Sequence, residues 1–96
     1  MSGGPGPAAL VRRVTILNER GLHARAAAKF VKVVEDHEAQ VSVVKDGVEV
    51  PGRSIMGLMM LAAGPGSELE LRAEGPAAET VLDALERLVA EKFHEG

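Results

Sequence analysis

The 96-residue sequence contains no cysteine, tryptophan or tyrosine and only two phenylalanines. Without cysteine, neither a disulfide framework nor a thiolate metal site can form. Two aromatic side chains are too few for the base stacking that single-stranded nucleic acid binding requires. The formal net charge of −3 at pH 7 also lacks the basic excess that a phosphate backbone attracts. The composition therefore predicts no nucleic acid partner.

Long apolar runs are missing as well. No segment approaches the roughly 20 apolar residues that span a bilayer, and the N-terminus lacks the charged-then-apolar layout of a secretion signal. We therefore expect a cytoplasmic protein without membrane insertion. A chain of 96 residues is long enough for one hydrophobic core but not for two. Residues 1–8, rich in glycine and proline, are expected to be a flexible tail, and residues 9–96 a single domain.

Apolar periodicity and turn signals divide the rest of the chain into strands and helices. The expected strands are 11–17, 40–44, 48–50 and 67–72, and the expected helices are 24–35, 54–61 and one that opens at Gly75-Pro76. The order β-α-β-β-α-β-α predicts an α+β fold, an open-faced two-layer sandwich. Its four-stranded antiparallel sheet is expected to carry three helices on one face.

His23 lies at the junction of the first expected strand and the first expected helix, in Gly21-Leu22-His23-Ala24-Arg25. The first turn of a helix presents unpaired backbone N–H groups and the positive end of the helix dipole, which together favour a bound phosphate. Arg25 adds a charge that can donate hydrogen bonds to phosphate oxygens. Neutral imidazole has a lone pair that can attack phosphorus. The junction therefore predicts a histidine that accepts a phosphoryl group.

These residues, with the following Ala27-Ala28-Lys29-Phe30 and the later run from Ser54 to Leu61, closely resemble the HPr family of histidine-containing phosphocarrier proteins. The resemblance extends from about Val11 to Phe93 and implies the HPr-like fold. It implies a relay protein of the phosphotransferase system, with no cofactor and no turnover of its own. His23 would accept phosphate, on the ring nitrogen nearer the backbone, from a phosphoenolpyruvate-dependent enzyme I. It would pass the phosphate to an enzyme IIA-type acceptor, and Arg25 would contact the phosphoryl group.

The commonest family pattern has proline directly after the arginine, whereas this chain has Ala26. Proline would preorganise the first helical turn, so Ala26 keeps one more N–H donor and gives up some rigidity. The substitution resembles members of the nitrogen-related and alphaproteobacterial branches. The pathway therefore stays open between sugar uptake and the regulation of nitrogen or carbon metabolism.

The expected helix 54–61 is apolar almost all round, so a single short helix cannot bury every side chain against one sheet. Methionine adapts to partners of different shape, and the resemblance implies that partner enzymes meet this helix and the surface around the histidine. The residues expected to dock partners are Ala24, Ala27, Arg53, Ile55, Met56 and Met59. A carrier that meets several partners is expected to be a monomer.

Ser54 precedes the same helix and is expected to cap it through its hydroxyl group. The resemblance implies a second role, because Ser54 matches the serine that an HPr kinase/phosphorylase modifies in some family members. A phosphate there would add negative charge to the docking surface and weaken binding to acidic partners.

Two other functional classes share some of these sequence features. A small acylphosphatase-like phosphohydrolase also uses an α+β sandwich and an arginine near a strand-to-helix loop, but no residue that positions water accompanies Arg25. A regulatory binding module without transfer would act through Ser54 and the apolar helix, and the presence of His23 counts against it. His37 and His94 show no metal-ligand spacing, so no metal is expected.

Overall fold

The computed structural model describes residues 9–95, so the expected tail 1–8 lies outside the described residues. The strands are β1 (Leu10–Thr15), β2 (Gln40–Lys45), β3 (Val48–Pro51) and β4 (Glu68–Glu74). The helices are α1 (Ala24–Glu35), α2 (Ile55–Met60) and α3 (Ala78–Ala90), followed by a short 3-10 turn at Lys92–His94. The predicted order of elements and the predicted α+β class are confirmed.

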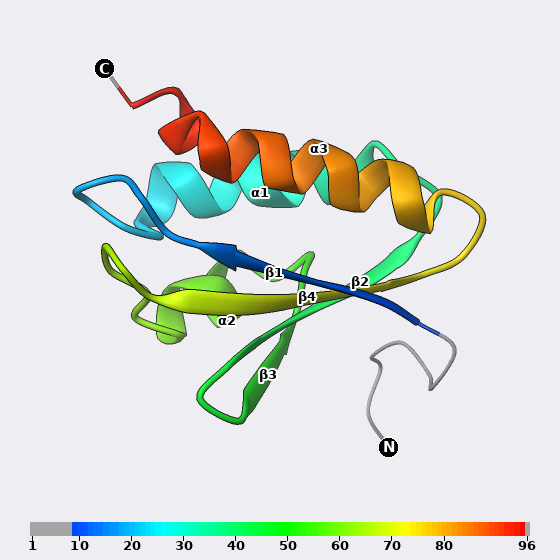
Figure 1. The fold of residues 1–96 in the computed structure, drawn as a ribbon, viewed down its shortest axis with the longest axis horizontal. Helices are drawn as coiled ribbons and strands as arrows, with labels where there is room; N and C mark the ends of the chain where they lie inside the picture. The colour runs from blue at the N-terminus through cyan, green and yellow to red at the C-terminus, as the bar shows by residue number, and fades with distance from the viewer. Residues whose placement is uncertain (1–8, 96) are drawn as a thin grey trace.

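The four strands form one antiparallel sheet in the order β1-β4-β2-β3 (Figure 1). Because β4 is central, it pairs along its whole length with β1 or β2. This pairing extends β4 to Glu74, beyond the predicted end at Arg72, since Ala73 faces Leu10 and Glu74 faces Gln40. The strand β1 ends at Thr15, before the predicted Leu17.

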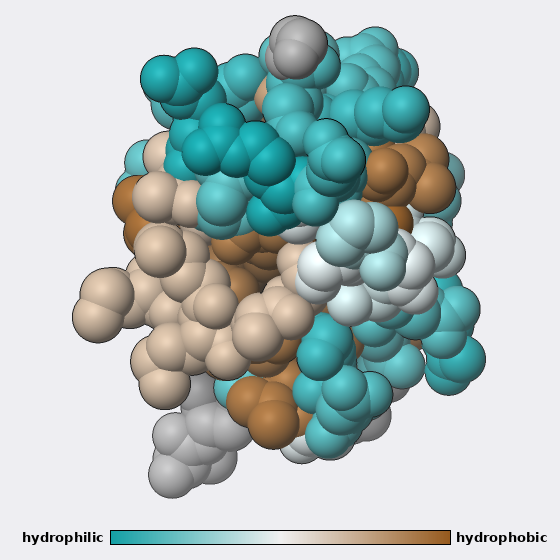
Figure 2. Space-filling model, turned by 90° about the vertical axis from the view of Figure 1, so that its left-hand side faces the viewer, coloured by the Kyte–Doolittle hydropathy of each residue, from teal (hydrophilic) through white to brown (hydrophobic). Residues whose placement is uncertain are grey.

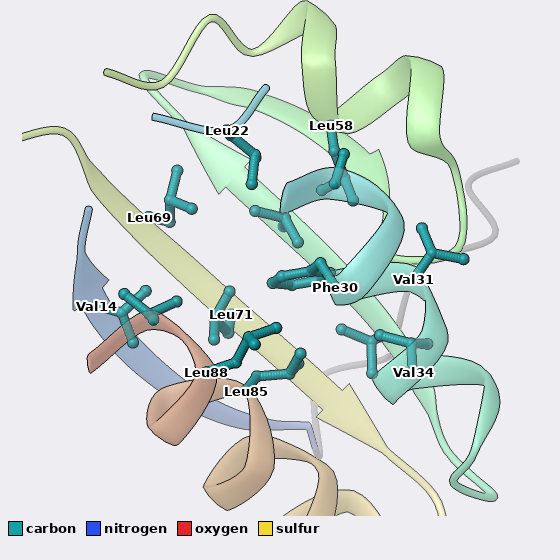
Figure 3. Close-up of a cluster of buried hydrophobic side chains, with 14 of the residues drawn as sticks. Val14, Leu22, Phe30, Val31, Val34, Leu58, Leu69, Leu71, Leu85 and Leu88 are labelled. Carbon is teal, nitrogen blue, oxygen red and sulfur yellow. The ribbon is translucent and has the colours of Figure 1, made fainter. Parts of the chain in front are cut away.

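Side chains alternate along the strands as predicted, so each strand turns one apolar face toward the helices. Leu69, Leu71 and Ala73 of β4 are fully buried, while the residues between them are partly exposed. Phe30 of α1 has no exposed surface and lies at the centre of the core, between the sheet and the helices (Figure 3). The three helices therefore share a single hydrophobic core on one face of the sheet.

Helices α1 and α3 lie side by side above the sheet, and both the start of α1 and the C-terminus are found at the left-hand end in Figure 1. Helix α2 contacts α1 and β3. Helix α3 begins at Ala78 rather than near Pro76, since the backbone of its N-cap, Ala77, is not helical (φ −104°, ψ 24°). The Ala77 N–H bonds instead to Glu38 O in the α1–β2 loop, at 3.0 Å. No helix in the described part of the chain is long and apolar enough to cross a membrane.

Candidate phosphorylation site

His23 is the N-cap of α1, with extended backbone angles (φ −75°, ψ 179°) and no capping hydrogen bond from its side chain. The first intrahelical bond runs from the Ala27 N–H to His23 O, at 2.8 Å. The N–H groups of Ala24, Arg25 and Ala26 precede it and have no acceptor within the helix. Since 21% of the His23 side chain is exposed, its ring is accessible beside a set of donors suited to an anion.

The loop before His23 is held against the chain that follows α2. The N–H of Leu22 donates to Ala63 O at 2.9 Å, and the Leu22 side chain is buried. Gly21 has φ +64° and lies so close to this segment that a Cβ atom would meet Ala63 O at 2.3 Å. Only glycine fits both the conformation and the space. The approach of the chain to His23 is therefore fixed by the tertiary structure.

Two residues that the sequence analysis missed also lie at the site. Asn18 is 1% exposed, and its Nδ2 donates to Gly21 O at 2.8 Å and to Glu95 Oε1 at 2.7 Å. The same Glu95 oxygen is 3.6 Å from Nε2 of His23. Because Asn18 and Glu95 are separated by 77 positions, no local pattern in the sequence could have paired them.

The 3-10 turn Lys92–His94 brings Glu95 to this position. Lys92, Phe93 and His94 have φ values of +57°, +56° and +58°, a left-handed conformation that costs about 1–2 kcal/mol for each such residue. Burial of the Phe93 side chain and a 2.7 Å hydrogen bond from Lys29 Nζ to Phe93 O hold the turn in place. Lys29 of α1 therefore anchors the C-terminal turn.

A hollow of about 380 Å³ opens beside His23. Its lining comes from the loop before α1, the first turns of α1 and the C-terminal turn, namely Glu19, Arg20, His23, Arg25, Ala26, Lys29, Phe93, His94 and Glu95. Arg25 is exposed and has no hydrogen-bonding or ionic partner among residues 9–95. Its guanidinium is therefore available to an anion in the hollow.

The hydrogen bond from Asn18 holds the pKa of Glu95 below its ordinary value of 4.5, with a further contribution from the backbone N–H of Arg20. A carboxylate whose pKa is depressed by folding stabilises the protein above its unfolded pKa, and this stability is lost as the pH falls through the folded pKa. We expect the difference in free energy of unfolding between the wild type and Glu95→Gln to shrink as the pH is lowered from about 6 to about 3. Urea titrations over this range measure it, and a difference independent of pH would contradict the prediction.

The structure divides the predicted docking residues into two groups. Ala24, Arg53, Ile55, Met56 and Met59 are exposed, Met56 to 72%. Ala27 was wrongly predicted as a docking residue, because it faces the core and has no exposed surface. Met60, which was not among the predicted docking residues, is 78% exposed, and only Leu58 of α2 is buried.

Figure 2 looks onto the end of the molecule at which α1 begins. An apolar area, coloured tan and brown, lies below a band of teal hydrophilic side chains.

Ser54 caps α2 as predicted, since its Oγ accepts a 2.9 Å hydrogen bond from the Gly57 N–H. The exposed side chains of α2 therefore belong to an ordered, capped helix.

The other histidines are held by local contacts. A ring nitrogen of His37, Nδ1, lies 2.7 Å from Val33 O one turn earlier, and Nε2 of His94 lies 2.7 Å from Glu91 Oε1. Within residues 9–95, no group of three histidine, aspartate or glutamate side chains is arranged to hold a metal ion.

A family model and the sequences of known proteins match most of this chain. Residues 10–91 match the family model described as "PTS HPr component phosphorylation site". The phosphocarrier protein HPr of Cupriavidus necator is 46% identical over 87 residues, which cover 91% of this chain and 98% of the relative. The phosphocarrier protein NPr of Shewanella violacea is 40% identical, with 90% and 94% of the two chains covered.

Solved structures agree with the sequence relatives. An HPr crystal structure from Thermoanaerobacter tengcongensis matches with a TM-score of 0.86 and 39% identity, covering 91% of this chain and 98% of that chain. A second structure from the same organism, described as an HPr dimer, has a TM-score of 0.72 and 42% identity over 85% of this chain and 97% of that chain.

Proposed function

The chain belongs to the HPr family of phosphocarrier proteins, and from this premise we propose that His23 is the residue that carries its phosphoryl group. The protein is a phosphoryl relay protein of the phosphotransferase system rather than an enzyme in its own right. The observation that carries the assignment to His23 is its position as the N-cap of α1. Its partly exposed ring lies beside N–H groups that have no acceptor within the helix and beside the guanidinium of Arg25, which has no partner among residues 9–95.

The site suits a group that must be accepted and then released. A helix N-terminus contributes roughly 0.3–1 kcal/mol to a nearby exposed anion, and one arginine adds charge-assisted hydrogen bonds of about 1.5–3 kcal/mol. Much tighter binding would slow release to the next protein. In our proposal Arg25 and the N–H groups of the first turn of α1 stabilise the phosphoryl oxygens, and the Nδ1 atom of His23 forms the bond to phosphorus.

The direct test is to incubate the protein with phosphoenolpyruvate and an enzyme I. We expect one phosphate per chain, labile in acid and stable in base, which tandem mass spectrometry locates on His23. Phosphate on another residue would overturn the assignment to His23. A protein that stays unmodified while it hydrolyses acyl phosphate would instead support the acylphosphatase-like alternative, for which the comparisons give no support.

We further propose that the exposed side chains of α2 dock the partners, an enzyme I-type donor and an enzyme IIA-type acceptor. Met56→Glu is expected to slow phosphoryl transfer about tenfold, because it places a charge in an apolar interface. Its fold should be unchanged, since 72% of the side chain is exposed. Val11→Glu on β1, where 52% of the side chain is exposed, is the matched control and should leave the rate unchanged. Equal rates for the two variants would exclude α2 from the interface.

Ser54 offers a place for regulation by an HPr kinase/phosphorylase. It is partly exposed and lies between Arg53 and the apolar side chains of α2, so a phosphate on its hydroxyl would add negative charge to the docking surface. We expect Ser54→Asp to slow phosphorylation of His23 severalfold while it keeps the cap, because aspartate also caps helices. Ser54→Asn keeps the cap without the charge and should transfer at the wild-type rate. A normal rate in Ser54→Asp would remove the regulatory proposal.

We place the carrier in the cytoplasm with its partner enzymes and expect it to act as a monomer, although a dimer is described for one HPr structure of Thermoanaerobacter tengcongensis. Both HPr and NPr relatives match over most of the chain, so Ala26 does not by itself separate sugar uptake from nitrogen-related regulation. Phosphorylation assays with sugar-specific and nitrogen-related IIA proteins would separate the two pathways.

A further inference from the structure

We propose that Glu95 is a positioning residue for phosphoryl transfer, which holds the proton of His23 on Nε2 and so leaves Nδ1 to accept and release the phosphoryl group. The proposal rests on the proposed role of His23 as the carrier. It begins from the geometry at the C-terminal end of the described chain, where the Glu95 carboxylate faces Nε2 at 3.6 Å. This distance is longer than a hydrogen bond, as is often found for catalytic contacts in a free protein before the reacting complex forms.

The carboxylate is held in one place. Asn18 Nδ2 donates to Glu95 Oε1 at 2.7 Å and to Gly21 O at 2.8 Å. Both partners are oxygens, so a flipped amide would bring its own oxygen against them, and the orientation of Asn18 is fixed. The backbone N–H of Arg20 also interacts with the carboxylate. Glu95 is therefore oriented by groups from the loop that precedes His23.

The C-terminal turn shows that this placement costs free energy. Lys92, Phe93 and His94 all adopt left-handed angles, which residues other than glycine rarely do. The buried Phe93 side chain and the bond from Lys29 hold the turn despite this cost. Strained backbone that the surrounding contacts maintain is concentrated at functional sites. Here the strained turn carries the only carboxylate within 4 Å of a ring nitrogen of His23 among the described residues.

The effect on the ring follows from the chemistry of the two groups. A carboxylate accepts hydrogen bonds and donates none, so it favours the tautomer that carries the hydrogen on the nitrogen it faces. With the hydrogen on Nε2, the lone pair lies on Nδ1, on the other side of the ring. The carboxylate and the incoming phosphoryl oxygens are then separated by the imidazole, which limits their repulsion.

The transfer balances without a proton moving in or out. The Nδ1 lone pair forms the N–P bond while the bond between phosphorus and the donor breaks, and that electron pair leaves with the donor. The ring becomes a cation that keeps its hydrogen on Nε2. When the acceptor attacks phosphorus, the N–P electron pair returns to Nδ1 and the ring is neutral again. Glu95 stabilises the positive ring that develops at phosphorylation, and this preorganised charge lowers the barrier to it.

The test combines a measurement that needs no partner with one that does. Nitrogen-15 NMR of the histidine ring should show the Nε2–H tautomer predominating for neutral His23 in the wild type and a loss of this preference in Glu95→Ala. Rapid-quench transfer from an enzyme I should be about tenfold slower in Glu95→Ala. Glu95→Gln should fall between the two, because its amide oxygen accepts a hydrogen bond but has no charge.

The control is Glu79→Gln in the first turn of α3, at the end of that helix farthest along the chain from Glu95. It removes the same charge and should change neither the tautomer nor the rate. Circular dichroism confirms that each variant is folded. A wild-type tautomer preference and transfer rate in Glu95→Ala would overturn the role of Glu95. If the wild type itself takes up no phosphate, the proposed function fails instead, and the tautomer measurement still decides whether Glu95 directs the ring.

Discussion

Replacing His23 with alanine is expected to abolish phosphoryl uptake while the domain remains folded. The loss should be at least about 1000-fold, because a nucleophile that forms the covalent intermediate has no substitute in the site. The fold should survive, because the His23 side chain makes no capping hydrogen bond and is partly exposed. We expect the free energy of unfolding to change by no more than about 0.5 kcal/mol. Labelled phosphoenolpyruvate and enzyme I measure the uptake, and urea unfolding measures the stability.

His37→Ala is the matched control for this variant. His37 lies beyond the end of α1, with a ring nitrogen 2.7 Å from Val33 O, and it does not line the hollow beside His23. Its replacement should leave uptake at the wild-type level. Acid-labile phosphate on the His23→Ala variant, or its loss from His37→Ala, would show that the carrier residue has been misassigned.

The second large effect is expected from Gly21→Ala, two positions before His23. An alanine Cβ atom would lie 2.3 Å from Ala63 O and 2.9 Å from Gly64 Cα, and both of these are backbone atoms that no side-chain rotation can move aside. The residue also needs φ +64°, which alanine adopts at a cost of about 1–2 kcal/mol. We expect the free energy of unfolding to fall by about 3 kcal/mol or more. Transfer should slow as well, because relief of the clash breaks the Leu22 to Ala63 hydrogen bond that positions the loop.

Gly47→Ala separates the cost of the positive φ from the cost of the steric clash. Gly47 in the β2–β3 turn has φ +82°, but no atom lies within 4 Å of its ideal Cβ position. Its replacement therefore carries only the conformational cost, about 1 kcal/mol. Thermal and urea unfolding of both variants give the comparison. Equal destabilisation would mean that the close approach of Gly21 to Ala63 has no energetic weight.

The sequence was most informative where local patterns determine the outcome. Helix α1 has the predicted bounds, because its apolar periodicity is strong and the polar loop before it marks its start. The capping role of Ser54 was also predictable, since the bond it makes is to a residue three positions later. The start of α3 was predicted near Pro76, because proline favours the first helical position, but the backbone of Ala77 is not yet helical.

The docking residues were predicted correctly only in part. The sequence indicated that α2 must leave apolar side chains exposed, which the structure confirms for Ile55, Met56 and Met59. Ala27, by contrast, is fully buried, as expected for a residue that the periodicity of α1 places on the same face as Phe30. The family resemblance had suggested a surface role that this periodicity contradicts.

By itself, the sequence determined the order of the elements, the family and the position of His23 at a helix start, because each depends on residues near one another in the chain. Only the tertiary structure decided what surrounds the histidine. The left-handed C-terminal turn brings Glu95 to Asn18 and His23 across more than 70 positions. Such a contact depends on how α3 packs beside α1 and on the burial of Phe93, and no local pattern in the sequence records either.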